Sequence, residues 1–358
     1  MRAAILRDYG EPLAIRDVPE PDAGPDDAVV RVDACGVCRS DWHAWMGHGE
    51  WADDRVPRGQ ILGHEPAGEV VSVGDTVERF TPGDSVVVPF SLGDGTCPYC
   101  RRGAGNVCDD GRALGFEPDA PGAFAERVAV PNADYNLVER PDWLDATAAA
   151  ALGCRYMTAY HALAERAALS GGDTLAVHGC GGVGLSTVQI GAALGARVVA
   201  VDVDETALDL AADLGADVTV NPAELGDEAS VPGRVRSLTT GGVDVSVDAL
   251  GIAETCRNSV RSVRPKGIHV QVGLTAEAER GEVSLPTDWM TRWEVSFLGA
   301  RGMPPTSYDD LFALVESTAI DPGALVSREL PLSAVSDRLA AMGEYGVRGV
   351  EVVTDLSG

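Results

Sequence analysis

Short valine-rich runs separated by glycine, proline and aspartate dominate the first part of the chain. Such runs occur at residues 29–32, 70–73, 85–88 and 128–130. Brief apolar runs bounded by turn-forming residues are typical of β-strands joined by tight turns. The pattern predicts a small, mainly β domain with a barrel-like sheet over residues 1–155.

Beyond residue 156 the pattern changes to strand-like runs that alternate with helical periodicity. Residues 173–178 are an apolar run, and the apolar positions after it recur on one helical face as far as Gly195. The next segment repeats this plan and ends at Gly215. Glycine just past the last periodic residue is a common helix stop, because it adopts the left-handed conformation without strain.

Two more strands are expected at residues 243–247 and 268–272, with a helix between them at about 253–263. Strands that alternate with helices pack as a parallel sheet covered on both faces. The sequence therefore predicts an α/β protein with a doubly wound parallel sheet over residues 156–295, followed by a tail at 296–358.

Composition adds bounds to this picture. The chain has 358 residues with 45% hydrophobic content, which suits two domains with their own cores. No apolar run is long enough to cross a bilayer, and the N-terminus lacks the apolar stretch of a signal peptide, so no membrane partner and a cytoplasmic location are expected. The eight cysteines indicate metal ligands and reduced thiols in preference to a disulfide framework.

The formal net charge is −27, with 55 acidic against 28 basic residues. This balance excludes a nucleic-acid partner, because phosphate binding needs a basic face. Lys266 is the only lysine, so nearly all basic residues of the chain are arginine. A GC-rich genome alone would favour arginine, but a charge of this size favours a salt-adapted protein whose self-repulsion is screened in molar salt.

The densest chemistry in the chain lies between Cys38 and His43. Together with His64 and Cys154, Cys38 supplies two thiolates and one imidazole. Each residue alone is more often an ordinary buried side chain. As a set they match a zinc site with an open fourth position, the arrangement that distinguishes catalytic from structural zinc.

A glycine-rich loop follows the predicted strand at residues 173–178. The motif comprises Gly179, Gly181, Gly182, Val183 and Gly184, and it opens a predicted helix. In this context the helix N-terminus receives a pyrophosphate while glycine lets the backbone approach it.

Cofactor preference is predicted from the end of the next strand. Asp202 lies where a carboxylate bonds the ribose hydroxyls of NAD. No Arg or Lys occurs from residue 203 to 208, so a 2′-phosphate would meet uncompensated carboxylates. NAD is therefore the expected cofactor, and an NADP alternative would need an arginine from elsewhere.

Gly63-His64-Glu65, followed by Gly68, Gly74 and Val77, resembles the signature of zinc-dependent medium-chain alcohol dehydrogenases. The segment from Cys38 to His43 resembles the first zinc loop of that family. Since the dinucleotide motif also falls where the family has it, the resemblance covers essentially the whole chain. It implies a GroES-like β-barrel catalytic domain at 1–155, a Rossmann domain at 156–295, and a tail at 296–358 that returns to the catalytic domain.

The resemblance also implies roles for single residues. Cys38, His64 and Cys154 would hold the catalytic zinc, which would acidify a bound alcohol while a hydride passes to the nicotinamide. Ser40 would receive the alcohol proton and His43 would relay it towards solvent. The other implied roles are support of the zinc ligands by Glu65 and Asp41, pyrophosphate contact by Arg39, nicotinamide packing by Thr158, and a substrate-pocket aromatic at Phe90. In a chain with only 5% aromatic residues, Trp45 and Trp51 after the zinc loop favour an apolar pocket wall.

A second metal site is implied by the spacing of Asp94, Cys97, Cys100 and Cys108. The family often has four cysteines at this spacing around a structural zinc, and here Asp94 replaces the first. A carboxylate is an acceptable zinc ligand, so a site with three cysteines and one aspartate is chemically reasonable. The alternative is a surface lobe that has lost its metal.

The leading functional hypothesis is an NAD-dependent zinc alcohol dehydrogenase acting on small or medium primary or secondary alcohols. A polyol, sugar or amino-alcohol dehydrogenase of the same family is the close alternative, and a non-catalytic NAD- and zinc-binding redox sensor is a third. Family analogy further implies a homodimer or homotetramer, with residues 294–298 as a strand edge for pairing.

Overall fold

The computed structural model describes residues 1–49, 55–226, 229–275, 278–318, 320–343 and 349–357. The chain divides into two compact units. Unit 1 contains Met1–Met157, Gly302–Ser317 and Asp321–Gly358, and unit 2 contains Thr158–Arg301 and Thr318–Ile320. Among the described residues no helix is long and apolar enough to cross a membrane.

Unit 1 is built on a seven-stranded sheet with the order β16-β17-β3-β4-β5-β9, in which β8 also pairs with β3. All four strands that the valine-rich runs predict are confirmed, as β3, β4, β5 and β8. The strands of unit 1 are β1 (Arg2–Ile5), β2 (Ala14–Asp17), β3 (Ala28–Val37), β4 (Pro66–Val73), β5 (Ser85–Val87), β6 (Ser91–Leu92), β7 (Arg112–Ala113), β8 (Arg127–Val130), β9 (Val138–Glu139), β16 (Val326–Pro331) and β17 (Val350–Asp355).

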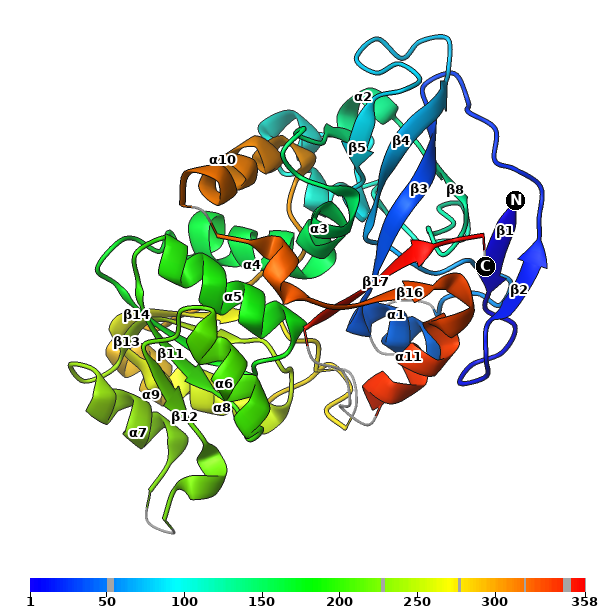
Figure 1. The fold of residues 1–358 in the computed structure, drawn as a ribbon. Helices are drawn as coiled ribbons and strands as arrows, with labels where there is room; N and C mark the ends of the chain where they lie inside the picture. Colours follow the sequence, from blue (N-terminus) through cyan, green and yellow to red (C-terminus); the bar gives the residue numbers. More distant parts are fainter. Residues whose placement is uncertain (50–54, 227–228, 276–277, 319, 344–348, 358) are drawn as a thin grey trace. The chain divides into compact units, whose positions relative to one another are not determined.

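The long strand β3 organises this unit, since it pairs with β4, β8 and β17. Strand β17 comes from the end of the chain, and Figure 1 shows it running beside β3. At Gly68 in β4 a Cβ atom would lie 1.9 Å from the carbonyl oxygen of Arg31 in β3, so only glycine permits this close pairing. The C-terminal strands β16 and β17 therefore extend the sheet that the N-terminal strands form.

Short helices flank this sheet. Asp145 caps α3 by accepting a hydrogen bond from the Ala148 N–H. The helices that lie wholly or mainly in unit 1 are α1 (Arg39–Trp45), α2 (Ala133–Asn136), α3 (Ala146–Ala151), α10 (Tyr308–Thr318) and α11 (Val335–Gly343), with short 3₁₀ turns η1 (Cys100–Arg102), η2 (Gly105–Val107), η6 (Pro305–Ser307), η7 (Pro322–Leu325) and η8 (Leu332–Ala334) and the π-helical stretch η3 (Leu152–Tyr156).

Unit 2 contains a six-stranded, all-parallel sheet with the order β12-β11-β10-β13-β14-β15. This confirms the predicted doubly wound sheet, whose chain order reverses between β10 and β13. The strands are β10 (Thr174–His178), β11 (Arg197–Val201), β12 (Val218–Val220), β13 (Val243–Asp248), β14 (Val263–Gln271) and β15 (Ser296–Gly299).

The three helices predicted for unit 2 are confirmed at Gly182–Ala193, Glu205–Asp213 and Ala253–Ser262, whereas those at Val231–Leu238 and Thr287–Trp293 were not predicted. Gly195 and Gly215 follow the first two helices with φ of 83° and 115°, which confirms both predicted stops. The helical segments are α4 (Met157–Tyr160), η4 (His161–Arg166), α5 (Gly182–Ala193), α6 (Glu205–Asp213), η5 (Pro222–Glu224), α7 (Val231–Leu238), α8 (Ala253–Ser262) and α9 (Thr287–Trp293).

One strand differs from its prediction. Strand β14 begins at Val263, five residues before the expected start at 268, because it follows α8 without a loop. A register shift against β13 and a positive φ of 64° at Lys266 accommodate the early start. The turn-like sequence Pro265-Lys266-Gly267 therefore lies inside an irregular strand.

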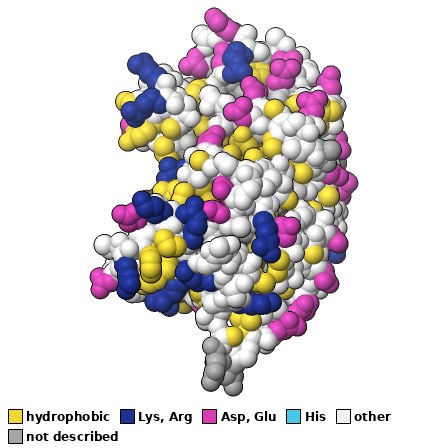
Figure 2. Space-filling model, turned by 90° about the vertical axis from the view of Figure 1, so that its left-hand side faces the viewer, with side chains coloured by type: hydrophobic (Ala, Val, Ile, Leu, Met, Phe, Trp, Pro, Cys, Tyr) yellow, Lys and Arg dark blue, Asp and Glu magenta, His cyan; other side chains and the backbone are white. Residues whose placement is uncertain are grey.

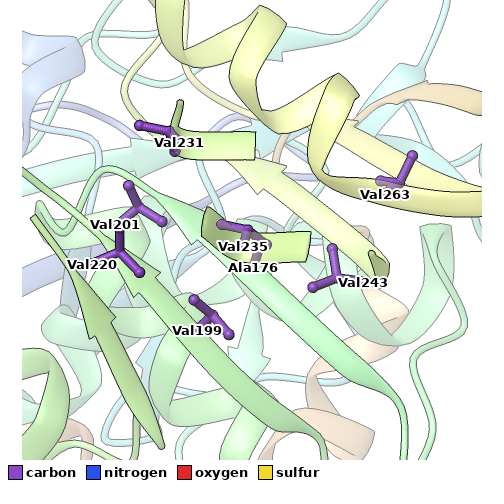
Figure 3. Packing of buried hydrophobic residues seen from close by; sticks show 8 residues of the cluster. All are labelled: Ala176, Val199, Val201, Val220, Val231, Val235, Val243 and Val263. Atoms are coloured by element: carbon purple, nitrogen blue, oxygen red, sulfur yellow. The ribbon is translucent and has the colours of Figure 1, made fainter. Parts of the chain in front are cut away.

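The surface of the chain is rich in carboxylates, as its composition requires. Figure 2 shows acidic side chains scattered over the face that it draws, whereas basic and hydrophobic side chains gather at its lower left. Beneath the surface of unit 2, a valine cluster joins the sheet to α7. Figure 3 shows Val199, Val201 and Val220 of the sheet close to Val231 and Val235 of α7. Each valine buried in this way contributes about 1.5–3 kcal/mol.

The same sheet also buries two histidines. His178 ends β10, and its Nε2 has no hydrogen-bond partner among the described residues. His269 in β14 is hydrogen-bonded to Ser259 and Gln271 at 2.8 and 3.2 Å. Burial lowers the pKa of His178 to about 3 and that of His269 to about 4. Both side chains are therefore neutral at physiological pH.

We predict that His178 makes the fold acid-sensitive. Its folded-state pKa lies below the ordinary value of 6.5, so the unfolded chain takes up the proton first. The contribution of neutral His178 to the free energy of unfolding is complete above pH 6.5 and is lost as the pH falls towards 3. Between pH 7 and pH 5 this loss is about 2 kcal/mol. Between pH 7 and pH 5, the free energy of unfolding measured in urea should therefore fall by about 2 kcal/mol less in His178→Leu than in the wild type.

The matched control is His161→Gln, because this histidine lies outside the buried parallel sheet and pairs with Glu165. It should keep the pH dependence of the wild type. An equal pH dependence in His178→Leu and the wild type would contradict the prediction.

Candidate functional site

The segment that begins with Cys38 is organised by the carboxylate of Asp41. Cys38 caps α1, and its backbone N–H donates to Asp41 Oδ2 at 3.0 Å. Asp41 Oδ1 accepts from the Gly63 N–H at 3.0 Å and from His64 Nδ1 at 2.8 Å. Since Asp41 is fully buried, this one carboxylate fixes the position of Cys38 relative to His64.

His64, Cys38 and Cys154 come together as the sequence predicts. Their ligand atoms, with a carboxylate oxygen of Glu65, all lie within 4.8 Å of one another. With its Nδ1 bonded to Asp41, His64 leaves a buried Nε2 that has no hydrogen-bond partner among the described residues. A buried polar atom without a partner is costly, and a metal ion held by this nitrogen and two thiolates would satisfy it. The donor set therefore fits zinc.

The two thiols are electrostatically inequivalent. A hydrogen bond from Cys154 is the main cause that lowers the pKa of Cys38, and the same contact raises the pKa of Cys154. Cys38 therefore loses its proton easily, whereas Cys154 keeps its proton. A divalent cation favours loss of the second proton as well, because ligation requires the thiolate form.

Cys154 is presented by an irregular helical stretch. Residues 152–156 form the π-helical segment η3, and Gly153 within it has non-helical backbone angles of φ −57° and ψ −145°. A Cβ atom on Gly153 would lie 2.5 Å from the Glu65 Cβ, so glycine is required for Cys154 to approach this residue. Local π-helical geometry is common at functional sites, where it redirects a side chain.

A buried ion pair lies beneath the ligands. Arg155 donates to Glu65 through Nη2 at 2.5 Å and Nε at 3.2 Å, and its Nη1 donates to the Val37 carbonyl at 3.1 Å. Burial raises the pKa of Glu65 to about 7, against the lowering influence of Arg155. The sequence analysis expected support from Glu65 but missed Arg155. Its position next to a predicted ligand was the available signal.

Aromatic rings surround His64. Phe90 lies edge-on to it at 5.6 Å between ring centroids, and Phe116, which sequence reasoning missed, lies at 4.8 Å. Trp45 belongs to the core of unit 1, since it is 7% exposed and its indole N–H donates to the Glu11 carbonyl at 2.6 Å. Trp51 lies outside the described residues.

The other residues expected near the substrate lie on α1. Cys38 Sγ is 3.9 Å from Ser40 Oγ, so the hydroxyl stands beside the metal-ligand cluster. His43 is one turn further, half-buried, and contacts His48 at 3.0 Å between Nδ1 atoms. Arg39 donates to the Met342 carbonyl at 2.8 Å and lies over the Trp42 ring at 4.3 Å.

The second predicted metal site is also assembled. Ligand atoms of Asp94, Cys97, Cys100 and Cys108 lie within 4.8 Å of one another. Backbone N–H groups point at the sulfurs, from Cys100 to Cys97 at 3.4 Å and from Asp94 to Cys108 at 3.3 Å. Hydrogen bonds from the backbone of Cys97 and Thr96 lower the pKa of Asp94, which keeps it an anion. Three sulfurs and one carboxylate in this arrangement fit a closed zinc site.

The dinucleotide loop lies in unit 2 between β10 and α5. Gly179 has a φ of 94°, and a Cβ on Gly184 would lie 1.8 Å from the Gly179 carbonyl, so both positions require glycine. Gly181 caps α5, and a Cβ there would meet nothing within 4 Å, which leaves the loop open to a ligand. Gly182 and Val183 form the first turn of α5, whose N–H groups suit a pyrophosphate.

Asp202 follows β11 beside this loop. Its Oδ2 accepts from the Cys180 N–H at 2.6 Å, and its Oδ1 accepts from the Asp204 N–H at 3.0 Å. The carboxylate is half-buried, so it remains accessible at the edge of the loop. Thr158 lies elsewhere in unit 2, buried in α4 at 5% exposure.

Two family descriptions match the chain. Residues 24–142 match the alcohol dehydrogenase GroES-like domain, and residues 182–317 match the zinc-binding dehydrogenase family. The NAD-dependent alcohol dehydrogenase of Sulfolobus acidocaldarius is 32% identical over 99% of both chains. An alcohol dehydrogenase from Thermus sp. ATN1 has a similar structure, with a TM-score of 0.87 and 32% identity over 99% of both chains.

Relatives named for other activities match at similar levels. The D-arabinose 1-dehydrogenase (NADP(+)) of Saccharolobus solfataricus is 30% identical over 99% of this chain and 97% of its own. The L-threonine 3-dehydrogenase of Symbiobacterium thermophilum is 32% identical over 99% of this chain and 98% of its own. Identity at this level therefore does not separate alcohols from sugars or amino acids.

We predict that Asp41→Asn weakens zinc binding at the cluster of Cys38, His64 and Cys154. An amide cannot supply the charged acceptor that orients His64, and losing such an outer partner typically costs about 10- to 100-fold in metal affinity. Competition with a chelator would measure this loss. Asp33→Asn, which changes a partly exposed aspartate of β3 that pairs with Arg31, is the matched control. An affinity equal to that of the control would contradict the role of Asp41.

Proposed function

The chain belongs to the zinc-binding, GroES-like alcohol dehydrogenase family, and from this premise we propose that it oxidises small or medium, largely apolar alcohols. It is a zinc- and NAD-dependent oxidoreductase that interconverts alcohols and the corresponding aldehydes or ketones. The observation that carries the proposal is the buried Nε2 of His64, which has no hydrogen-bond partner among the described residues and lies in one cluster with two thiols. Zinc bound there supplies a Lewis acid that lowers the pKa of an alcohol.

Side chains of the protein carry out proton transfer and hold the metal ligands in position. Ser40, beside Cys38, accepts the proton of the alcohol, and His43 on the same helix carries it onwards. Burial is the main cause that lowers the pKa of His43 to about 4, so this imidazole is neutral and ready to accept a proton at physiological pH. The ion pair of Glu65 with Arg155 holds the loop that carries His64 against the helical stretch that carries Cys154.

We propose that the glycine-rich loop of unit 2 holds the nucleotide. The turn formed by Gly181, Gly182, Val183 and Gly184 receives the pyrophosphate, with Gly179 making the turn possible. Asp202 binds the ribose hydroxyls, Thr158 packs on the nicotinamide, and Arg39 contacts the pyrophosphate. No basic residue follows Asp202 as far as Leu208, which supports NAD over NADP.

The substrate class follows from the lining of the zinc cluster. Among the described residues of unit 1, the rings of Phe90 and Phe116 lie against His64, which favours apolar substituents on the alcohol. A sugar, polyol or amino-alcohol substrate is the second candidate, favoured by the activities for which two relatives are named. A redox sensor without catalysis would have no evident use for the hydroxyl and imidazole on α1.

We further propose that Asp94, Cys97, Cys100 and Cys108 hold a structural zinc. The backbone N–H groups that point at the sulfurs support this assignment, since they stabilise thiolates. Because the four ligands close the coordination shell, this zinc would stabilise the lobe between β6 and β7 and take no part in turnover.

The chain is also proposed to form a homodimer or homotetramer. Strand β15 is the edge of the parallel sheet, and Phe297 within it is 39% exposed. Next to it, α9 contributes Trp289 and Trp293 to a groove of about 480 Å³. One exposed ring at an open strand edge, with two partly buried rings lining the adjacent groove, favours pairing with a second copy. A sedimentation mass of a single chain would rule this out.

The proposed setting is a salt-rich cytoplasm. All eight cysteines are free thiols, which suits a reducing compartment. The net charge of −27 suits molar salt, where repulsion between surface carboxylates is screened. Stability that does not rise with salt would contradict the salt adaptation.

The expected activity is formation of NADH from apolar alcohols, measured by absorbance in molar salt with added zinc. Aliphatic alcohols and benzyl alcohol should be oxidised in preference to glycerol and glucose, because the rings around His64 offer no hydrogen bonds to extra hydroxyls. Cys38→Ser should abolish turnover while NADH binding persists. Oxidation of polyols alone would establish the second candidate, and activity that survives in the variant would refute the mechanism.

Two zinc ions per chain are expected by elemental analysis. Cys97→Ser should lower this number by one and destabilise the chain, because a structural zinc contributes directly to folding. The alcohol dehydrogenase activity per zinc-loaded, folded molecule should be retained. Cys256→Ser is the matched control, since this thiol lies outside both metal clusters. One zinc ion in the wild type would show that the Asp94 lobe is metal-free.

A further inference from the structure

Two histidines share a hydrogen bond at the end of α1. The Nδ1 atoms of His43 and His48 are 3.0 Å apart, so one nitrogen donates a proton to the other. The His48 backbone N–H also donates to the His43 carbonyl at 3.0 Å. Because both the ring and the backbone of His48 are hydrogen-bonded to His43, the conformation of the turn keeps the two rings together.

The turn between the two histidines is itself constrained. Gly47 has a φ of 72°, and a Cβ there would lie 2.7 Å from the Tyr9 ring. The Trp42 ring packs against both imidazoles, at 4.8 Å from His43 and 5.2 Å from His48 between centroids. The Trp42 ring and the tight turn at Gly47 therefore hold the His48 ring against His43.

The surroundings of His43 disfavour a lasting positive charge. Burial is the largest cause that lowers its pKa, followed by the charges of Arg39 and His48, while Cys38 acts in the opposite direction. Tyr9, which packs at the turn, has its hydroxyl bonded to the Val56 carbonyl at 2.8 Å. A proton that reaches His43 must therefore move on, and His48 is the hydrogen-bonded base in contact with it.

We propose that His48 is the next proton carrier after His43 in the oxidation of the alcohol. This inference rests on the proposed function, in which Ser40 and His43 carry the proton away from the substrate. The alcohol loses a hydride to NAD⁺ and a proton to the relay. As His43 gains that proton at Nε2, its Nδ1 proton passes to Nδ1 of His48, and His48 releases its own Nε2 proton to water.

The experiment compares two substitutions that separate proton transfer from positioning. His48→Phe keeps a ring for Trp42 but removes the acceptor nitrogen, whereas His48→Gln keeps an oxygen that can accept the hydrogen bond but cannot carry a proton. Both should lower kcat for alcohol oxidation at neutral pH by about 10-fold, a small share of the effect of a full acid–base group. His161→Phe makes the same chemical change at a residue that pairs with Glu165 instead, and it is the matched control.

Three readouts distinguish a proton carrier from a structural residue. Added imidazole should restore the rate of His48→Phe, the solvent deuterium isotope effect on kcat should rise, and the deficit should shrink as rising pH supplies hydroxide as an alternative acceptor. Zinc content and NADH affinity should equal those of the wild type. Full activity in His48→Gln without imidazole would show that His48 only positions His43, and would overturn the proposal.

A measurement on the protein without substrate tests the pair independently of turnover. In ¹⁵N-histidine NMR spectra, the ring nitrogens of His43 should report a changed tautomer balance in His48→Phe and not in His161→Phe. A wild type that oxidises no alcohol would refute the proposed function. A wild type that oxidises alcohols, with His48→Phe matching it in rate, isotope effect and pH profile, would refute the role of His48 alone.

Discussion

The buried ion pair between Glu65 and Arg155 is the constraint on which the geometry of the metal cluster depends. Two opposite charges are stable in a protein interior only when paired and hydrogen-bonded, and removing one partner of such a pair costs about 3–5 kcal/mol. Arg155 satisfies both carboxylate oxygens of Glu65 and also the Val37 carbonyl. Because Glu65 follows His64 and Arg155 follows Cys154, one ion pair fixes two ligands.

This constraint explains local features that otherwise look irregular. A Cβ on Gly36 would lie 2.2 Å from Glu65 Oε2, and one on Gly153 would lie 2.5 Å from the Glu65 Cβ. Glycine on both sides makes room for the pair, and the kinked stretch η3 lets Arg155 and Cys154 reach the same region. A lysine could not replace Arg155, because a point charge lacks the planar fork that engages two oxygens and a carbonyl together.

The sequence predicts well those features that depend on residues close together in the chain. The glycine stops at 195 and 215, the valine-rich strands and the dinucleotide loop follow from propensity, periodicity and positive φ, and the structure contains each of them. Contacts between distant segments were beyond such rules. The pairing of Glu65 with Arg155 had only one local signal, the position of Arg155 next to a predicted ligand, and the position of Phe116 against His64 had none. Trp45 shows the same limit, because a tryptophan near a site and a tryptophan in the core have the same local sequence.

The chain combines two electrostatic regimes that respond differently to salt. Surface pairs such as Arg58 with Asp8 have half-exposed side chains, so molar salt screens them together with the repulsion among the acidic residues. The pairs of Arg155 with Glu65 and of His64 with Asp41 have side chains that are at most 5% exposed, and salt cannot enter to screen them. Changes in ionic strength therefore act on the stability of the whole chain while the contacts that orient the metal ligands stay the same. An acidic surface can in this way vary with the environment without altering the chemistry of the buried site.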